Sequence, residues 1–213
     1  MVAELDPRQL LDEGEREQAA RFVFDRDRVR YVAAHVQLRC ILGAYLGMDP
    51  AALRFAQGLH GRPLLAGPPA GRLEFNLSHS AAVALLAVAH QGPLGADVEA
   101  LREVRDWRDL AAHYFTVEEG RSLEAPGEQP ERAFLRCWTR KEAALKSTGI
   151  GLSQPPREVQ VGAGPGPGEA RVRAAVGSVT VAVDSFAVPA AALGAWAVPP
   201  GVRVTEWLEY VEQ

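Results

Sequence analysis

WTRKEAALK, residues 138–146, is the stretch from which the rest of this sequence can be interpreted. It lies inside residues 130–148, where a proline opens a helical pattern and Gly149 follows as a stop signal. It contains Lys141 and Lys146, and every other basic residue of the chain is an arginine. Because a lysine ammonium is a compact charge that suits phosphate oxygens or proton transfer, we expect chemistry on this helix.

Two charged residues of this helix, Glu142 and Lys146, are spaced i, i+4 and therefore lie on one face. A solvent-exposed ion pair, worth a few tenths of a kcal/mol, is the simplest interpretation. Phe134, Trp138 and Leu145 indicate, however, that part of the helix is buried. Charged groups beside such an apolar stripe favour a functional role.

The N-terminal part of the chain predicts helices followed by strands. Helices are expected at residues 7–20, with Asp6 as N-cap, and at residues 27–46, with Gly47 past the end. Strands are expected at residues 73–77, 83–89 and 94–99, with residues 90–93 as a hairpin-like turn between the last two.

The C-terminal part repeats this order. Thr116 opens a short helix with a capping box, and the long helix at residues 130–148 follows. After a turn at residues 162–168, the pattern gives three strands and a short amphipathic tail: residues 172–176, 179–188, 193–198 and 204–211. The repeated order predicts an α+β fold with two similar lobes, residues 1–93 and 94–213.

Composition limits the classes of function. The 213 residues are 47% apolar, which is enough for a core, and the net charge of −4 argues against general nucleic-acid binding. Cys40 and Cys137 lack metal-type spacing and are expected to be reduced, buried thiols. With no secretory signal pattern and no apolar run of membrane-spanning length, we expect a cytoplasmic protein that does not bind membranes.

Asp97 and Glu99 lie two residues apart on an expected strand, so their carboxylates point to the same face. Two carboxylates at this spacing can converge on one cation, and oxygen-only ligation suits Mg²⁺. A solvated acidic strand end is the alternative interpretation.

Residues 76–80, NLSHS, lie between two expected strands. Ser78, His79 and the backbone amides of a tight turn would make a phosphate cradle. A Ser-His hydrolase is disfavoured, because no nucleophile elbow and no third member can be identified. Packing or capping by His79 stays an alternative, and Gly61-Arg62-Pro63 adds a cation in a turn shortly before.

Taken together, four segments resemble the motifs of the 4'-phosphopantetheinyl transferases, in the two-lobed, monomeric type that activates peptide and polyketide synthases. Each matches one family motif, in the family's order: GRP at residues 61–63, FNLSHS at 75–80, GADVE at 95–99 and WTRKEAALK at 138–146. The resemblance extends to residues 149–152 after the helix. Ala96 departs from the larger aliphatic residue that usually precedes the aspartate.

The resemblance implies two pseudo-symmetric α+β lobes with coenzyme A in the cleft between them. It implies that a serine of an apo acyl or peptidyl carrier protein attacks the β-phosphate of coenzyme A and releases adenosine 3',5'-bisphosphate. The roles implied for the residues are these: Asp97, Glu99 and Glu142 hold Mg²⁺, Glu142 takes the serine proton, Lys146 neutralises phosphate charge, and Arg62, Ser78, His79 and Lys141 contact coenzyme A.

The resemblance also implies an arginine that binds the 3'-phosphate of coenzyme A, for which five candidates compete: Arg16, Arg21, Arg26, Arg28 and Arg30. Because carrier proteins are typically acidic, five further arginines are candidates for docking them, although a solvated surface is the favoured interpretation of each one individually: Arg102, Arg105, Arg108, Arg132 and Arg136. Two other classes remain open, a non-catalytic coenzyme A-binding module and a carrier-binding adaptor. A transferase that has lost its activity is disfavoured, because the chain retains the acidic residues and the lysine to which the resemblance assigns the reaction: Asp97, Glu99, Glu142 and Lys146.

Overall fold

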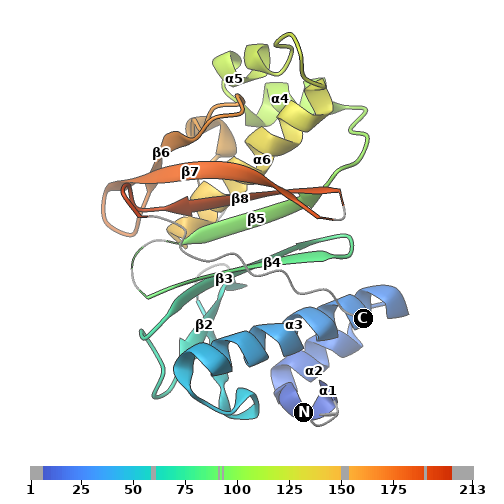
Figure 1. Cartoon of the computed structure of the whole chain (residues 1–213), viewed down its shortest axis with the longest axis vertical. Coiled ribbons are helices and arrows are strands. Elements are labelled where there is room, and N and C mark those ends of the chain that lie inside the picture. The colour runs from blue at the N-terminus through green and yellow to red at the C-terminus, as the bar shows by residue number, and fades with distance from the viewer. Residues whose placement is uncertain are drawn as a thin grey trace.

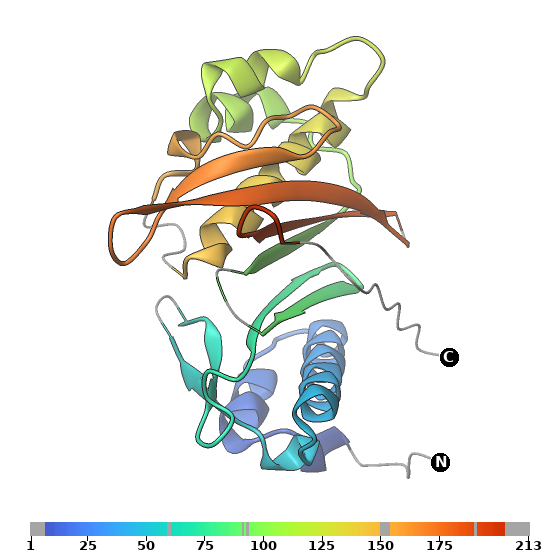
Figure 2. The same ribbon diagram turned by 60° about the vertical axis from the view of Figure 1, so that its left-hand side comes forward.

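The computed structural model describes residues 7–58, 61–90, 92, 94–149, 154–189 and 191–202. Helices and short strands of the N-terminal half form one end of the molecule, and a larger sheet with its helices forms the other (Figure 1). Strands of both halves meet in the middle, where β3 and β4 lie next to β5 (Figures 1 and 2). The α+β class expected from the sequence is confirmed.

The N-terminal half begins with two short helices and one long helix: α1 at Pro7–Leu10, α2 at Glu13–Ala20 and α3 at Asp25–Leu46. The single helix expected at residues 7–20 is therefore wrong. Asp12 ends it by acting as N-cap of α2 in a capping box with Glu15. Gly47 ends α3 at a φ of 65°, which glycine adopts without strain, as the sequence predicts.

Two antiparallel pairs of strands complete this half, after a 3₁₀ turn at Pro50–Ala52. The strands are β1 at Arg54–Gln57 and β2 at Pro63–Ala66, which pair together, and β3 at Glu74–Ser80 and β4 at Val83–Ala89, which form the second pair. The strand expected at residues 83–89 is confirmed, and β1 and β2 were not expected.

The C-terminal half contains a four-stranded antiparallel sheet with the order β5-β8-β7-β6. Its strands are β5 at Gly95–Ala100, β6 at Gly168–Arg173, β7 at Ser178–Val188 and β8 at Ala192–Val198. Its helices are α4 at Trp107–Tyr114, α5 at Val117–Ser122 and α6 at Pro130–Ser147, with a 3₁₀ turn at Pro156–Glu158. The capping box of Thr116 and the long helix α6 are confirmed, whereas α4 was not expected.

The hairpin expected between residues 83–89 and 94–99 does not form. In the described residues β4 pairs with β3, and β5 pairs with β8, so the two strands belong to different sheets. Several expected features lie outside the described residues: the Asp6 N-cap, part of the turn at residues 90–93, residues 150–152 and the tail at residues 204–211.

Each half has its own apolar core. Buried leucines of α3 pack with residues of the first strands and Phe75 in one cluster. Side chains of α4, α6 and the four-stranded sheet form the other. Of the two free thiols, Cys137 is buried in this second core, while Cys40 is only partly buried, which corrects the expectation for Cys40.

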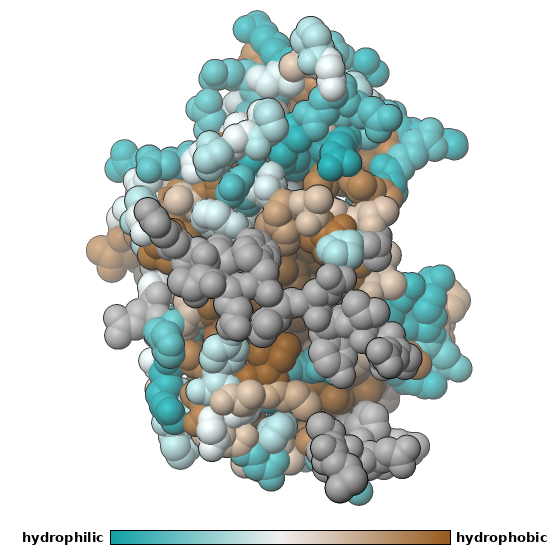
Figure 3. Space-filling model, in the orientation of Figure 1, coloured by the Kyte–Doolittle hydropathy of each residue, from teal (hydrophilic) through white to brown (hydrophobic). Residues whose placement is uncertain are grey.

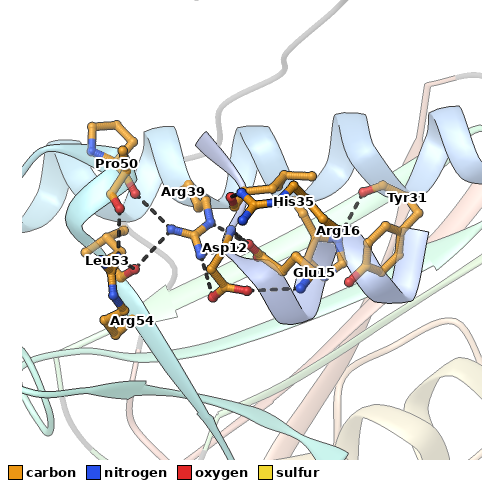
Figure 4. Close-up of polar contacts among 11 residues, drawn as sticks. Asp12, Glu15, Arg16, Tyr31, His35, Arg39, Pro50, Leu53 and Arg54 are labelled. Atoms are coloured by element: carbon orange, nitrogen blue, oxygen red, sulfur yellow. Dashed lines mark hydrogen bonds and ion pairs between the residues drawn. The ribbon is translucent and has the colours of Figure 1, made fainter. Parts of the chain in front are cut away.

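A buried arginine ties the N-terminal helices together (Figure 4). The guanidinium of Arg39 on α3 is fully buried and contacts the carboxylates of Asp12 at 2.9 Å and Glu15 at 2.7 Å. It also donates to the backbone carbonyls of Pro50 and Leu53, each at 3.0 Å. Because a buried charge must be paired, this network fixes α2 and the chain after α3 against α3.

Within the described residues, no helix combines the length and the apolar character needed to cross a membrane.

Candidate active site

Three elements meet where the two halves join, and together they carry most of the predicted site residues. Strand β5 packs directly on helix α6 at Gly95, where a Cβ atom would lie 1.8 Å from the carbonyl oxygen of Ala143. Only glycine permits this approach, which brings β5 with its two carboxylates beside the helix that carries Glu142 and Lys146. Strand β3 lies on the other edge of β5.

Asp97 is the centre of the cluster. One of its oxygens, Oδ1, lies 2.6 Å from the ammonium of Lys146 and accepts a hydrogen bond of 2.8 Å from the hydroxyl of Ser78. The Lys146 ammonium also lies 4.0 Å from the carboxylate of Glu142. The structure therefore brings together four residues that the sequence places on three separate segments.

The carboxylates of the cluster influence each other electrostatically. Burial raises the pKa of Glu142, and the negative charges of Asp97 and Glu99 raise it further against the opposing effect of Lys146. Burial likewise raises the pKa of Asp97, while Lys146 and Ser78 oppose it. The negative charge of Glu99 thus acts on Asp97, and the charges of both Asp97 and Glu99 act on Glu142.

The donor set suits a hard divalent cation. The second oxygen of Asp97, Oδ2, is buried and has no hydrogen-bond partner among the described residues. An orphaned carboxylate oxygen next to two further carboxylates is the chemistry that Mg²⁺ requires. Within the described residues, however, no group of three such side chains is close enough to hold a metal ion, and the ammonium of Lys146 contacts Asp97 where a metal ion would bind.

Ser80 is a residue of the site that sequence reasoning missed. Its hydroxyl donates to Glu99 Oε2 at 2.8 Å, and Arg102 contacts the same oxygen at 2.6 Å. The signal was present, because Ser78 and Ser80 have the same two-residue spacing as Asp97 and Glu99. It was hidden by the assumption that residues 78–80 form a turn.

The expected turn at residues 78–80 is wrong. These residues belong to β3, which runs to Ser80, and the chain reverses only at Ala81, whose φ is 53°. Ser78 therefore faces Asp97, whereas His79 points to the opposite face of the strand. Residues 78–80 therefore do not form the tight turn whose backbone amides were expected to bind phosphate.

Lys141 lies inside the C-terminal half. Its side chain is fully buried, and its ammonium pairs with Glu119 at 2.7 Å and donates to the carbonyls of Pro156 and Val159. These three acceptors use all the N–H groups of the ammonium. Since Lys141 lies about 100° round the helix from Glu142, it faces the interior of the C-terminal half, and its burial disfavours the contact with coenzyme A that the resemblance implies.

Arg62 lies at the end of α6. Its guanidinium donates to the carbonyl of Lys146 at 3.1 Å and to that of Phe75 at 3.0 Å, and it approaches Glu74 at 3.3 Å. Arg62 thus satisfies a carbonyl of the last helical turn and links it to β3. A contact between Arg62 and coenzyme A stays a prediction.

A groove of about 1550 Å³ runs between α3 and β4 and reaches the C-terminal sheet. Its lining is mainly apolar, and apolar side chains also gather around the middle of the face shown in Figure 3. His79 lines this groove together with three of the five N-terminal arginines: Arg16, Arg28 and Arg30. The carboxylates of the cluster are not among the residues that line this groove.

The arginines considered for carrier docking differ in accessibility. Arg102, Arg105 and Arg108 are exposed, and each contacts a glutamate. Arg136 is buried, pairs with Glu128 and donates to the carbonyl of Ala163, so it is excluded from docking.

Comparison with known protein families gives two matches that together include most of the chain. A profile of the 4'-phosphopantetheinyl transferase superfamily matches residues 93–175. A profile of the N-terminal part of 4'-phosphopantetheinyl transferases matches residues 6–91.

Curated proteins give the same result. The 4'-phosphopantetheinyl transferase HetI of Nostoc sp. (strain PCC 7120) is 41% identical over 146 residues, which is 68% of this chain and 62% of the relative. A putative 4'-phosphopantetheinyl transferase of Synechocystis sp. (strain PCC 6803), slr0495, is 31% identical over 68% of this chain and 59% of its own length. A 4'-phosphopantetheinyl transferase of Bacillus subtilis is 31% identical over 66% of this chain and 61% of its own length. The matched part thus spans less than two thirds of each relative.

Proposed function

Because the chain belongs to the 4'-phosphopantetheinyl transferase superfamily, we propose that it transfers the 4'-phosphopantetheine group of coenzyme A to a serine of an apo acyl or peptidyl carrier protein. The serine oxygen forms a bond to the β-phosphorus, and the bond from this phosphorus to the bridging pyrophosphate oxygen breaks. The products are the holo carrier protein and adenosine 3',5'-bisphosphate.

The observation that carries this proposal is the charged cluster at the junction of β3, β5 and α6. Phosphoryl-group transfer needs stabilisation of negative charge and a proton acceptor more than it needs a covalent intermediate. Lys146 supplies a cation, and Glu142 supplies a partly buried carboxylate whose raised pKa makes it a better proton acceptor.

We propose Asp97, Glu99 and Glu142 as the residues that hold Mg²⁺. When bound, the cation would neutralise charge on the pyrophosphate. Lys146 would leave Asp97 to contact a phosphate oxygen, since its ammonium is partly exposed and can reorient. Glu142 is placed to take the proton of the attacking serine.

For the remaining ligands, we propose that His79 and one of Arg16, Arg28 and Arg30 contact coenzyme A, because these four residues line one groove. We also propose the division into lobes at residues 93 and 94, and a monomeric, cytoplasmic enzyme that acts without nucleic acid or membrane. Size-exclusion chromatography with light scattering tests the monomer.

The variant Glu142→Gln tests the proposed function. It removes the carboxylate and keeps the size of the side chain, so conversion of an apo carrier protein, followed by intact-protein mass spectrometry, should fall to background. The circular dichroism spectrum and melting temperature should stay close to those of the wild type. Transfer at the wild-type rate would refute the role of Glu142 as metal ligand or base.

A non-catalytic coenzyme A-binding module is the alternative function. This alternative is disfavoured because Lys146 lies within ion-pair distance of both Asp97 and Glu142, and a module that only binds coenzyme A does not need these carboxylates beside the lysine. Coenzyme A binding without transfer to any carrier protein would support this alternative.

A further inference from the structure

The edge of β5 that faces β3 has an unusual hydrogen-bonding arrangement. Successive N–H groups of a strand point to opposite edges, and β5 uses one edge to pair with β8. In the strand pairing of the described residues, β3 pairs only with β4, so no backbone carbonyl of β3 completes the other edge. Buried N–H groups must nevertheless find acceptors.

Side-chain oxygens of β3 supply these acceptors. Three alternate residues of β3 each accept one N–H of β5: Asn76 Oδ1 from Ala96 at 2.9 Å, Ser78 Oγ from Val98 at 3.4 Å and Ser80 Oγ from Ala100 at 3.1 Å. Each pair is separated by 20 residues, so the two strands advance in the same direction in one register. We call these three contacts the side-chain ladder.

The serines of the ladder also contact the acid cluster. Ser78 donates to Asp97 at 2.8 Å, and Ser80 donates to Glu99 at 2.8 Å. A hydroxyl has one proton to donate. Because each serine oxygen accepts a backbone N–H of β5, its position is set by the strand, and its single proton is directed at the neighbouring carboxylate.

We propose that Ser78 and Ser80 are positioning residues, which hold Asp97 and Glu99 in the orientation that binds the cation of the transfer reaction. This inference rests on the proposed function and adds that the N-terminal half orients the metal ligands of the C-terminal half. The site is therefore complete only when β3 and β5 lie in the register of the side-chain ladder.

Ser80 is the residue on which the proposal is best tested. Ser78 also lies 3.4 Å from Lys146, so its removal would disturb more than one partner. Among the described residues, the hydroxyl of Ser80 makes hydrogen bonds with Glu99 and with the N–H of Ala100. Without the Ser80 hydroxyl, the carboxylate of Glu99 is free to move with the exposed side chain of Arg102, which contacts the same carboxylate oxygen.

The experiment compares Ser80→Ala with Ser80→Thr, which keeps the hydroxyl. Mn²⁺ binding is measured by electron paramagnetic resonance with coenzyme A present and no carrier protein, so that turnover does not enter. We expect Ser80→Ala to bind Mn²⁺ about fivefold more weakly, the factor for one hydrogen bond of about 1 kcal/mol. Ser80→Thr should bind it within about twofold of the wild type, and Ser122→Ala is the control, because the Ser122 hydroxyl bonds within α5.

Two results would overturn the inference, one for Ser80→Ala and one for Ser80→Cys. Unchanged Mn²⁺ affinity in Ser80→Ala would remove the positioning role, and so would a lower melting temperature with unchanged affinity, because that is a purely structural effect. If Ser80→Ala does not fold, Ser80→Cys, a weaker donor of similar size, must show the weakened binding instead. Failure of the proposed function is distinguishable, because the wild type itself would then not transfer the phosphopantetheine group of coenzyme A to a carrier protein.

Discussion

At the scale of single residues, the two lysines of the chain have opposite roles although they are five positions apart on one helix. Lys141 is fully buried and paired with Glu119 inside the C-terminal half. Lys146 is partly exposed and lies on Asp97 at the junction with the N-terminal half. One of them therefore stabilises the fold, and the other is the lysine that we propose for the chemistry.

Replacing each lysine by methionine should separate these roles. Lys141→Met leaves the carboxylate of Glu119 buried without its partner, which should lower the free energy of unfolding by about 3–5 kcal/mol. Lys146→Met should cost less stability, because the Lys146 side chain is 30% exposed and Ser78 still donates to Asp97, but it should lower phosphopantetheine transfer to near background. Urea unfolding and the mass-spectrometric assay check the pair, and an equal loss of stability in both variants would contradict the assignment.

Glu119 also predicts how stability depends on pH. Burial alone would raise its pKa, but Lys141 and the hydrogen bonds from the N–H groups of Thr116 and Val161 hold the pKa below its ordinary value. Folding thus favours the ionised carboxylate. The resulting stability is fully present above the unfolded pKa of about 4.3 and is lost as the pH falls through the lower folded pKa.

Urea unfolding at a series of pH values tests this dependence. Between pH values of about 5 and 3, the free energy of unfolding of the wild type should fall more steeply than that of Glu119→Gln, which has no carboxyl group at this position. Parallel curves for the two proteins would show that Glu119 is not the group responsible.

At the scale of elements, the contact of β5 with α6 depends on a single glycine. A Cβ at Gly95 would meet the Ala143 carbonyl at 1.8 Å and the Ser147 nitrogen at 2.6 Å, and both are backbone atoms of a packed helix. The two elements would have to move apart. This would separate Asp97 and Glu99 from Glu142 and Lys146.

Gly95→Ala should therefore lower the free energy of unfolding by about 1–3 kcal/mol or more, the usual cost of overpacking, and lower transfer beyond the loss explained by unfolding. Gly120→Ala is the matched control, since a Cβ there meets no atom of the described residues within 4 Å and alanine favours the helix α5. Wild-type stability and activity for Gly95→Ala would contradict the packing of β5 on α6.

Sequence patterns predicted elements well where a local rule decides them. Pro130, Gly149 and the apolar stripe defined α6, and the Thr116 capping box defined α5. The pairing of β4 and β5 was predicted wrongly, because the hairpin signal is local while β8 lies almost 100 residues further along the chain. Which distant strands pair depends on how their side chains pack in the folded protein, and a local sequence pattern carries no information about that packing.

The site shows the same division. The sequence predicted Asp97, Glu142 and Lys146, and the structure brings them together. Burial of Lys141 and the role of Ser80 were not foreseen, because burial and partners across strands depend on the tertiary structure. The signal that could have indicated Ser80 is the shared two-residue spacing of polar side chains in residues 76–80 and 95–99.

At the scale of the whole molecule, two halves with separate cores meet through few elements. The side-chain ladder joins β3 to β5, and Arg62 joins β3 to the end of α6. All the residues proposed for the chemistry lie at this junction. We therefore expect activity to depend on the junction more strongly than stability does, because each half retains its own core.

The most direct test of the central claim is the mass of an apo carrier protein after incubation with the purified chain, coenzyme A and Mg²⁺. We predict that the carrier serine gains one phosphopantetheine group, and that this gain is lost with EDTA and in Glu142→Gln. No gain on acyl and peptidyl carrier proteins, from a folded chain that still binds coenzyme A, would contradict it and favour the non-catalytic binding module.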